Sequence, residues 1–173
     1  MENGSLHKVY EKEIQDLYSA ETQLIEALPK MARAAKSPDL RRGFEQHLEE
    51  TRQQKQRLEE VAREEVARMA AISPHGKECI GMKALIEEGQ EMIKEDMPSP
   101  LRDAALILAA QKVEHYEIAS YGSVRTFAEM MDQSEAAAIL QQTLDEEGET
   151  DHKLSALAES HINAKALQES NWN

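Results

Sequence analysis

The sequence has few residues that interrupt helices or cross-link a chain. It contains 7 glycines, 5 prolines, 4% aromatic residues and one cysteine, Cys79, among 173 residues. A single cysteine excludes an intrachain disulfide and a metal site built from several cysteines. No apolar run approaches the roughly 18 residues of a membrane-spanning helix, and residues 1–5 lack the apolar core of a signal peptide. These absences favour a cytoplasmic protein that does not enter a membrane.

Acidic residues and strong helix formers are what the sequence has in abundance. Ala, Glu, Leu, Gln and Lys dominate, which is the composition of long helices. The formal net charge of −13 argues against nucleic acid and anionic membranes as partners, because both require a basic surface. The same charge would attract cations. The length suggests one domain, residues 1–173, with a substantial buried core.

Apolar residues recur every three or four positions over four long segments, which predicts an all-α fold. We expect an antiparallel four-helix bundle with a long crossover that carries a short fifth helix. The predicted parts are a helical hairpin at 6–71, a crossover at 73–98 with the short helix Cys79–Glu95, and a second helical hairpin at 100–168. Pro29 is expected to kink or break the first helix. The last helix is expected to run from Ser134 to about Gln168.

Each predicted hairpin places two glutamates inside its apolar stripes. In the first hairpin, Glu21 lies 16 residues before Ser37 in the turn, and Glu50 lies 13 residues after it. Residues equidistant from the turn of an antiparallel hairpin sit at the same height, and a mismatch of three residues is only about 5 Å. Both carboxylates are therefore expected at one level of the bundle, where unpaired buried charge is costly.

The second hairpin repeats this arrangement. Glu117 lies 16 residues before Gln133 in the turn, and Glu147 lies 14 residues after it. If the two hairpins pack antiparallel, all four glutamates converge in the middle of the bundle. Four carboxylates at close range force protonation or demand a cation, and the predicted stripes contain no Lys or Arg at this height.

Seven side chains are therefore candidate metal ligands. They are Glu21, His47, Glu50, Glu114, Glu117, Glu147 and Asp151. Two divalent ions would nearly neutralise the four converging glutamates, and oxygen ligands suit iron, which we expect first, or manganese. His47 is either a ligand or the hydrogen-bond partner of one, and Asp151 either binds metal or orients a ligand. The alternative for the whole set is a structural polar network.

Carboxylates on facing helices of a bundle are typical of ferritin-like di-iron and di-manganese proteins. The chain also resembles the YciE/YciF family of bacterial ferritin-like stress proteins, most closely its YciF branch, over about residues 6–165. The segments that carry the resemblance are DLYSAE at 16–21, HLEET at 47–51, RDAAL at 102–106, VEHYEIA at 113–119 and LDEE at 144–147. The resemblance implies a ferritin-like bundle that forms a homodimer.

The pair Glu114-x-x-Glu117 is also similar to the third-helix pair of rubrerythrins, the peroxide-reducing di-iron proteins. The sequence departs from the ferritin-like pattern at Gln53 and Thr150, where a ligand histidine is expected. Two functions stay open. One is a di-metal oxidoreductase, peroxidase-like or ferroxidase-like, that takes electrons from a donor protein. The other is a non-catalytic stress protein that acts through protein–protein interaction and whose metal site is structural or vestigial.

Two tyrosines near the predicted site, Tyr18 and Tyr116, are interpreted as packing residues, with a hydroxyl bond to a metal ligand as the alternative. Cys79 is expected to be an inert residue on the crossover. The dimer contact is expected on the apolar side of the short helix. Its residues are Ile80, Leu85, Ile86 and Met92.

Overall fold

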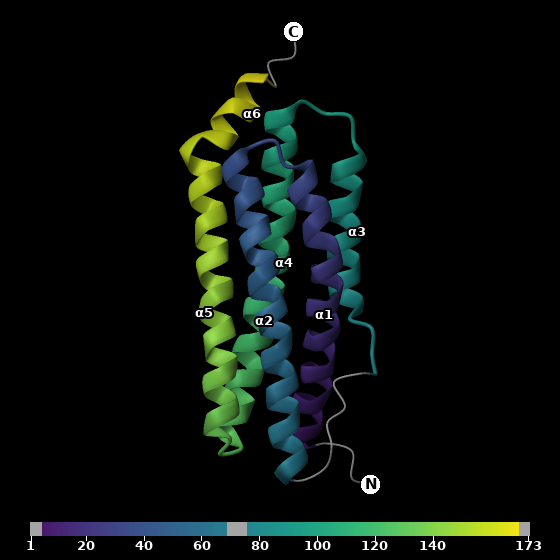
Figure 1. Cartoon of the computed structure of the whole chain (residues 1–173), viewed down its shortest axis with the longest axis vertical. Coiled ribbons are helices and arrows are strands. Elements are labelled where there is room, and N and C mark those ends of the chain that lie inside the picture. Colours follow the sequence, from purple (N-terminus) through teal and green to yellow (C-terminus); the bar gives the residue numbers. More distant parts are fainter. Residues whose placement is uncertain (1–4, 69–75, 170–173) are drawn as a thin grey trace.

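The computed structural model describes residues 5–68 and 76–169, and the elements within these ranges are helices (Figure 1). The elements in chain order are α1 (Leu6–Ala34), α2 (Pro38–Arg68), α3 (Ile80–Lys94), α4 (Ser99–Met130), α5 (Ser134–Leu157), the π-helical turn η1 (Ala158–Ile162) and α6 (Asn163–Glu169). The all-α prediction is confirmed. Within the described part of the chain, no helix is long and apolar enough to cross a membrane.

Four long helices form an antiparallel bundle of two hairpins, α1 with α2 and α4 with α5 (Figure 1). α1 also packs on α4, and α2 packs on α5. The crossover returns the chain to the opposite end of the bundle, and its helix α3 lies outside the bundle against α1 and α4. The predicted bundle and crossover are confirmed. The predicted hairpin end at residue 71 and crossover start at residue 73 lie outside the described residues.

One buried aspartate ties the turn between α1 and α2 to the start of α4. The two carboxylate oxygens of Asp103 accept hydrogen bonds from the backbone N–H groups of Lys36 and Ser37, each at 2.8 Å. Pro38 follows as the first residue of α2, where its missing N–H costs nothing. These contacts fix the height of the first hairpin relative to the second.

Two helices differ from their predicted course. α1 runs through Pro29 as one helix and ends at Ala34, so the proline does not break it. Pro29 lies five residues before the end of α1, so the hydrogen bond that its missing N–H would make to the carbonyl of Ile25 is lost while the helix continues. The last long helix ends early at Leu157, where η1 redirects the chain so that α6 packs across the end of α4 (Figure 1). The π turn brings Ile162 and Ala166 into buried positions.

The core of the bundle consists of two apolar clusters with a polar layer between them. One cluster includes Leu24, Phe44 and Leu106, and the other includes Ile14 and Leu58. On each of the four long helices, buried polar residues separate the two clusters. The polar layer consists of Glu21, His47, Thr51, Gln54, Glu114, Glu117, Thr143 and Glu147.

The start of α3 is fixed between α1 and α4 by Cys79. Its buried thiol accepts a hydrogen bond from the N–H of Met82 at 3.3 Å and lies 3.0 Å from the hydroxyl of Tyr116. Its carbonyl accepts a hydrogen bond from the side-chain amide of Gln23 on α1 at 3.1 Å. Cys79 therefore acts as a helix cap that joins three helices.

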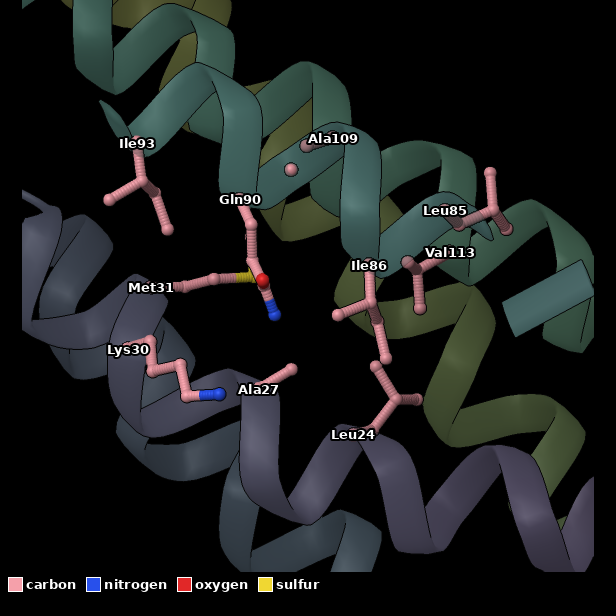
Figure 2. Close-up of a pocket in the computed structure, with 11 residues that line it drawn as sticks. Leu24, Ala27, Lys30, Met31, Leu85, Ile86, Gln90, Ile93, Ala109 and Val113 are labelled. Carbon is pink, nitrogen blue, oxygen red and sulfur yellow. The ribbon is translucent and has the colours of Figure 1, made fainter. Parts of the chain in front are cut away.

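Further along, α1, α3 and α4 enclose a small apolar cavity of about 20 Å³ (Figure 2). Leu24 and Met31 on α1 and Ile86 on α3 point into it, and Val113 of α4 completes the wall (Figure 2). A cavity of this size holds about one water molecule, and its apolar lining offers that water no adequate set of partners. The cavity therefore marks loose packing of α3 rather than a polar binding site.

Most of the apolar side of α3 is used inside the chain. Leu85, Ile86 and Met92 are partly buried and pack against the core, whereas Ile80 is 70% exposed. Among the four residues expected at the dimer contact, Ile80 is thus the one that stays largely exposed. The homodimer stays a prediction.

Two glycines of α3 provide a test of how this helix packs. A Cβ atom at Gly89 would lie 3.5 Å from that of Ala109, an ordinary contact, so Gly89→Ala should stabilise the fold by about 0.5–1 kcal/mol through lower backbone entropy in the unfolded chain. A Cβ atom at Gly81 would lie 2.8 Å from the ring of Tyr116, which is held by a hydrogen bond to Asp16, so Gly81→Ala should cost about 1–3 kcal/mol. Urea unfolding of both variants measures the difference, and shifts of the same sign would contradict this packing.

Candidate metal centre

Three helices bring four ligand-type side chains together in the polar layer. His47 comes from α2, Glu114 and Glu117 come from α4, and Glu147 comes from α5. One potential ligand atom of each lies within 4.8 Å of the other three. All four residues are buried, with at most 3% of their surface exposed. This set, which we call the four-residue cluster, could hold a metal ion.

His47 lies between inner and outer carboxylates. Its Nε2 atom is 3.4 Å from Glu114 Oε1 and 4.0 Å from Glu147 Oε2, and its Nδ1 atom is 3.7 Å from Glu50 Oε2. Neither ring nitrogen makes a hydrogen bond, although both are buried. An imidazole nitrogen without a partner, facing two carboxylates, is what a metal site requires before the ion is bound.

Glu147 is oriented by a neighbouring network from α2. The side-chain amide of Gln54 donates to Glu147 Oε1 and, at 3.2 Å, to Glu146. Arg57 donates to both carboxylate oxygens of Glu146, at 2.6 and 2.8 Å. The sequence pattern missed Arg57, which lies beside the apolar stripe of α2. Because this arginine pairs with Glu146, it forms an ion pair with none of the carboxylates of the four-residue cluster.

Glu21 reaches the same layer from α1. It is fully buried, and its Oε1 atom accepts a hydrogen bond from the hydroxyl of Tyr121 on α4. Its other oxygen has no partner. Glu21 is not one of the four clustered residues, but its charge raises the pKa of both Glu117 and Glu114. The layer therefore holds four buried glutamates, one from α1, two from α4 and one from α5.

The buried glutamates hold their protons more tightly than ordinary carboxyl groups. Burial is the largest cause of the raised pKa values of Glu21, Glu114 and Glu117, which all lie well above the usual 4.5. Repulsion from neighbouring carboxylates adds to each of these shifts. Burial also raises the pKa of Glu147, although His47 and the bond from Gln54 oppose the rise. Protonation and a bound cation are therefore the two ways to relieve the repulsion.

Glu50 and Asp151 lie outside the four-residue cluster. The side chain of Glu50 is 24% exposed on the outer side of His47, and its interaction with His47 is the largest cause of its lowered pKa. Asp151 is half-buried between α5 and α4, where it accepts a hydrogen bond from Gln111 at 3.2 Å and lies 3.4 Å from His115. Their roles as ligands stay predictions.

The tyrosine that contacts the site is one that the sequence pattern did not single out. Tyr18 and Tyr116 bond Glu59 at 3.1 Å and Asp16 at 2.7 Å, neither of which belongs to the cluster. Tyr121 instead donates to Glu21. The signal was the spacing from Glu117, because a step of four residues along the stripe reaches Tyr121, whereas a step of three reaches half-buried Ser120.

The sequence and structure of the chain match known proteins over nearly its whole length. Residues 5–167 match the family described as a domain of unknown function, DUF892. The chain belongs to the DUF892 family. Protein YciF of Escherichia coli strain K12 is 44% identical over 166 residues, which cover 96% of this chain and 98% of YciF. The resemblance to the YciE/YciF family is thereby confirmed for this DUF892 chain.

Solved structures show the same fold. The crystal structure of the Escherichia coli stress protein YciF, at 44% identity, superposes with a TM-score of 0.86 and covers 94% of this chain and 99% of YciF. YcfI of Rhodopseudomonas palustris, at 34% identity, gives a TM-score of 0.82 over 89% of this chain and 95% of YcfI. A protein of Xanthomonas campestris pv. campestris, at 24% identity, gives 0.69 over 98% of this chain and 100% of its own, and shows the fold alone. The ferritin-like prediction for this DUF892 chain is confirmed.

The raised pKa values predict how the metal-free DUF892 fold responds to pH. The folded chain binds the proton of Glu117 more tightly than the unfolded chain does. Protonation of Glu117 therefore adds to the free energy of unfolding. This contribution is complete below about pH 4.5 and is lost as the pH rises through the raised pKa of the folded state. Glu117→Gln removes this titration. With chelator present, the variant should match the wild type near pH 4.5 and exceed it at pH 8, by about 1.4 kcal/mol for each unit of pKa shift.

Urea unfolding between pH 4.5 and 8 measures this difference. Glu88→Gln is the matched control, because Glu88 is an exposed residue of α3 paired with Lys112 at 2.5 Å. Its difference from the wild type should stay small at every pH. A Glu117→Gln difference that does not change with pH would contradict the burial of an uncompensated carboxylate at this position.

Proposed function

We propose that this DUF892 protein binds divalent metal ions in its polar layer. The observation that supports the proposal is a set of buried ligand atoms without hydrogen-bond partners. They are both ring nitrogens of His47, both carboxylate oxygens of Glu117, and one oxygen each of Glu21, Glu114 and Glu147. A buried polar atom without a partner is destabilising, and cations in the layer would satisfy the carboxylate oxygens and Nε2 of His47, whereas Nδ1 of the same ring faces outward to Glu50. The residues present therefore fit a metal site.

The proposal includes two ions. His47, Glu114, Glu117 and Glu147 would hold the first. Glu21 is fully buried, keeps one oxygen without a partner, and exerts the strongest charge effect on Glu117. Glu21 would therefore provide a second position that shares Glu117 and Glu147 with the first. Four positive charges would then nearly neutralise the buried carboxylates.

We propose iron as the metal, with manganese as the alternative, because carboxylate oxygens with one imidazole suit both. Bound ferrous iron would supply electrons to peroxide or oxygen. The chain has one cysteine, Cys79, so a separate electron-donor protein is part of this proposal. The Escherichia coli relative is described as a stress protein, which agrees with a role in handling oxidants.

The protein's own contribution would be orientation and exclusion of water. Tyr121 holds one oxygen of Glu21, and Gln54 holds one oxygen of Glu147, so the other oxygen of each carboxylate stays directed to the site. The apolar clusters on either side of the layer keep bulk water away. In such surroundings the charge interactions between ligands and ions are strong.

A structural metal is the second candidate function. It is favoured by the position of the cluster, because an ion there would join α2, α4 and α5 between the two apolar clusters. The Rhodopseudomonas palustris relative is described, provisionally, as a structural protein. The two functions differ in whether bound iron reacts with peroxide.

Two acidic residues of α5 provide the test of metal binding. Equilibrium dialysis of the metal-free protein against Mn(II), or anaerobically against Fe(II), should give two bound ions per chain. Glu147→Gln should weaken binding by more than about 100-fold, beyond the loss typical of residues that only support ligands. Asp145→Asn is the control, because Asp145 is an exposed residue of α5 whose partner is Gln141, so it should keep near wild-type binding. Equal binding by both variants, or no binding by the wild type, would contradict the metal site.

Peroxide distinguishes the two functions. Protein loaded anaerobically with Fe(II) is mixed with hydrogen peroxide, and near-ultraviolet absorbance is used to monitor oxidation of the iron. We expect the bound Fe(II) to be oxidised at least about tenfold faster than free Fe(II). Loaded protein that oxidises no faster, but that loses melting temperature when chelator is added, would instead establish the structural role. The measurement is made on wild type and Glu147→Gln in parallel.

A further inference from the structure

A second cavity lies between α2 and α5 and is lined by two residues of the four-residue cluster, His47 and Glu114. It has a volume of about 30 Å³. Its outer wall includes the exposed residues Gln46 and Lys153, and its inner wall includes the buried residues His47 and Glu114. The volume corresponds to about two water molecules, so an ion or a peroxide molecule fits and an organic substrate does not. The apolar cavity in Figure 2, by contrast, is lined by none of the cluster residues.

Glu50 occupies the middle of this path. Its side chain lines the cavity and is 24% exposed, and Gln46 holds one of its oxygens at 2.7 Å. The other oxygen lies 3.7 Å from Nδ1 of His47, which is buried and has no hydrogen-bond partner. The opposite nitrogen of the same ring faces Glu114 at 3.4 Å. One imidazole therefore separates an outer carboxylate from an inner one.

We propose that this cavity is the route by which divalent cations enter and leave the cluster, and that Glu50 with Nδ1 of His47 forms a transient outer binding position on it. The inference rests on the proposed function, because it requires that the cluster binds a cation. A hydrated ion that enters the cluster must exchange its water for protein ligands. An outer carboxylate and an imidazole nitrogen replace part of that water before the ion passes His47.

The charges along the path favour a cation as the species that passes through the cavity. Phe44, Leu154 and Leu157 make much of the wall apolar, whereas the two acidic residues that line it are Glu50 and Glu114, and the chain carries a net charge of −13. The one ammonium group among the residues that line this cavity, that of Lys153, pairs with Glu149 at 2.8 Å. In this arrangement Glu50 governs the rate of exchange, whereas the buried glutamates govern the affinity.

Two variants test the route by independent means. Glu50→Gln removes the outer charge, and Gly43→Leu fills the mouth, because Gly43 lines the cavity and a Cβ atom added there would meet no other atom within 4 Å. The controls are Glu49→Gln, the neighbouring exposed residue paired with Arg52, and Gly148→Leu, an exposed glycine of α5 with equally open surroundings.

Stopped-flow absorbance with Co(II) alone measures the uptake rate, release to excess chelator measures the exit rate, and dialysis measures the final stoichiometry. Both test variants should slow uptake by about tenfold or more at unchanged stoichiometry, because Glu50→Gln removes the charge that raises the association rate and Gly43→Leu obstructs the cavity. Release should slow by the same factor, because a change on the route alone leaves the affinity unchanged. Both controls should keep wild-type rates. Wild-type rates in both test variants would overturn the proposed route. Loss of bound Co(II) in Glu50→Gln would also overturn it, because Glu50 would then be a permanent ligand of the bound ion. A wild-type chain that binds no Co(II) would overturn the proposed function itself.

Discussion

The burial of glutamates between two apolar clusters is the constraint on which the rest of this structure depends. An ionised carboxylate in a low-dielectric core is destabilising unless it is paired, and here several lie within reach of one another. Every long helix contributes a polar residue to the layer, so the relative heights of all four must be held. Asp103 holds the turn between α1 and α2 against α4, and Cys79 holds the crossover. The fold thus positions the layer from both of its sides.

The same chain contains a buried carboxylate that has only a structural role, and the comparison is informative. Asp103 is 4% exposed and receives two backbone hydrogen bonds at 2.8 Å, one on each oxygen. Glu117 is 0% exposed and receives none. Helices of this bundle also carry neutral donors in the layer, such as Gln54 and Tyr121, yet they satisfy only one oxygen of Glu147 and one of Glu21. A polar network for stability alone would resemble the surroundings of Asp103, since unpaired buried oxygens are rare. The unpaired oxygens of the layer are therefore the observation that supports the proposed metal site.

Much of the fold and part of the site could be predicted from spacing. The heights counted from the two turns placed Glu21, Glu117 and Glu147 in one layer, because α-helical rise is nearly constant. The face of the helix on which a residue lies is harder to predict. An apolar stripe advances by either three or four residues, and the two steps differ by about 100° around the helix axis. On α2 the inward position after His47 belongs to Thr51, four residues on, and Glu50 turns to the outer side. No local sequence pattern predicted the π turn after Leu157, because this turn depends on the packing of α6 on α4.

The position of His47 bears on the kind of metal that the proposed site of this DUF892 chain would favour. In the ferritin-like pattern, a histidine follows its glutamate by three residues on each of two helices. Here His47 precedes Glu50 by three residues, and the imidazole takes the inward place while the carboxylate lines the cavity outside it. The cluster consequently has one nitrogen donor and no thiolate, since Cys79 caps α3. Sites built mainly of carboxylate oxygens discriminate against copper and zinc less by affinity than by geometry and availability, and they suit iron and manganese. The inward place of His47 and the outward place of Glu50 on α2 therefore give the cluster its one nitrogen donor and leave a charged residue beside the proposed path to it.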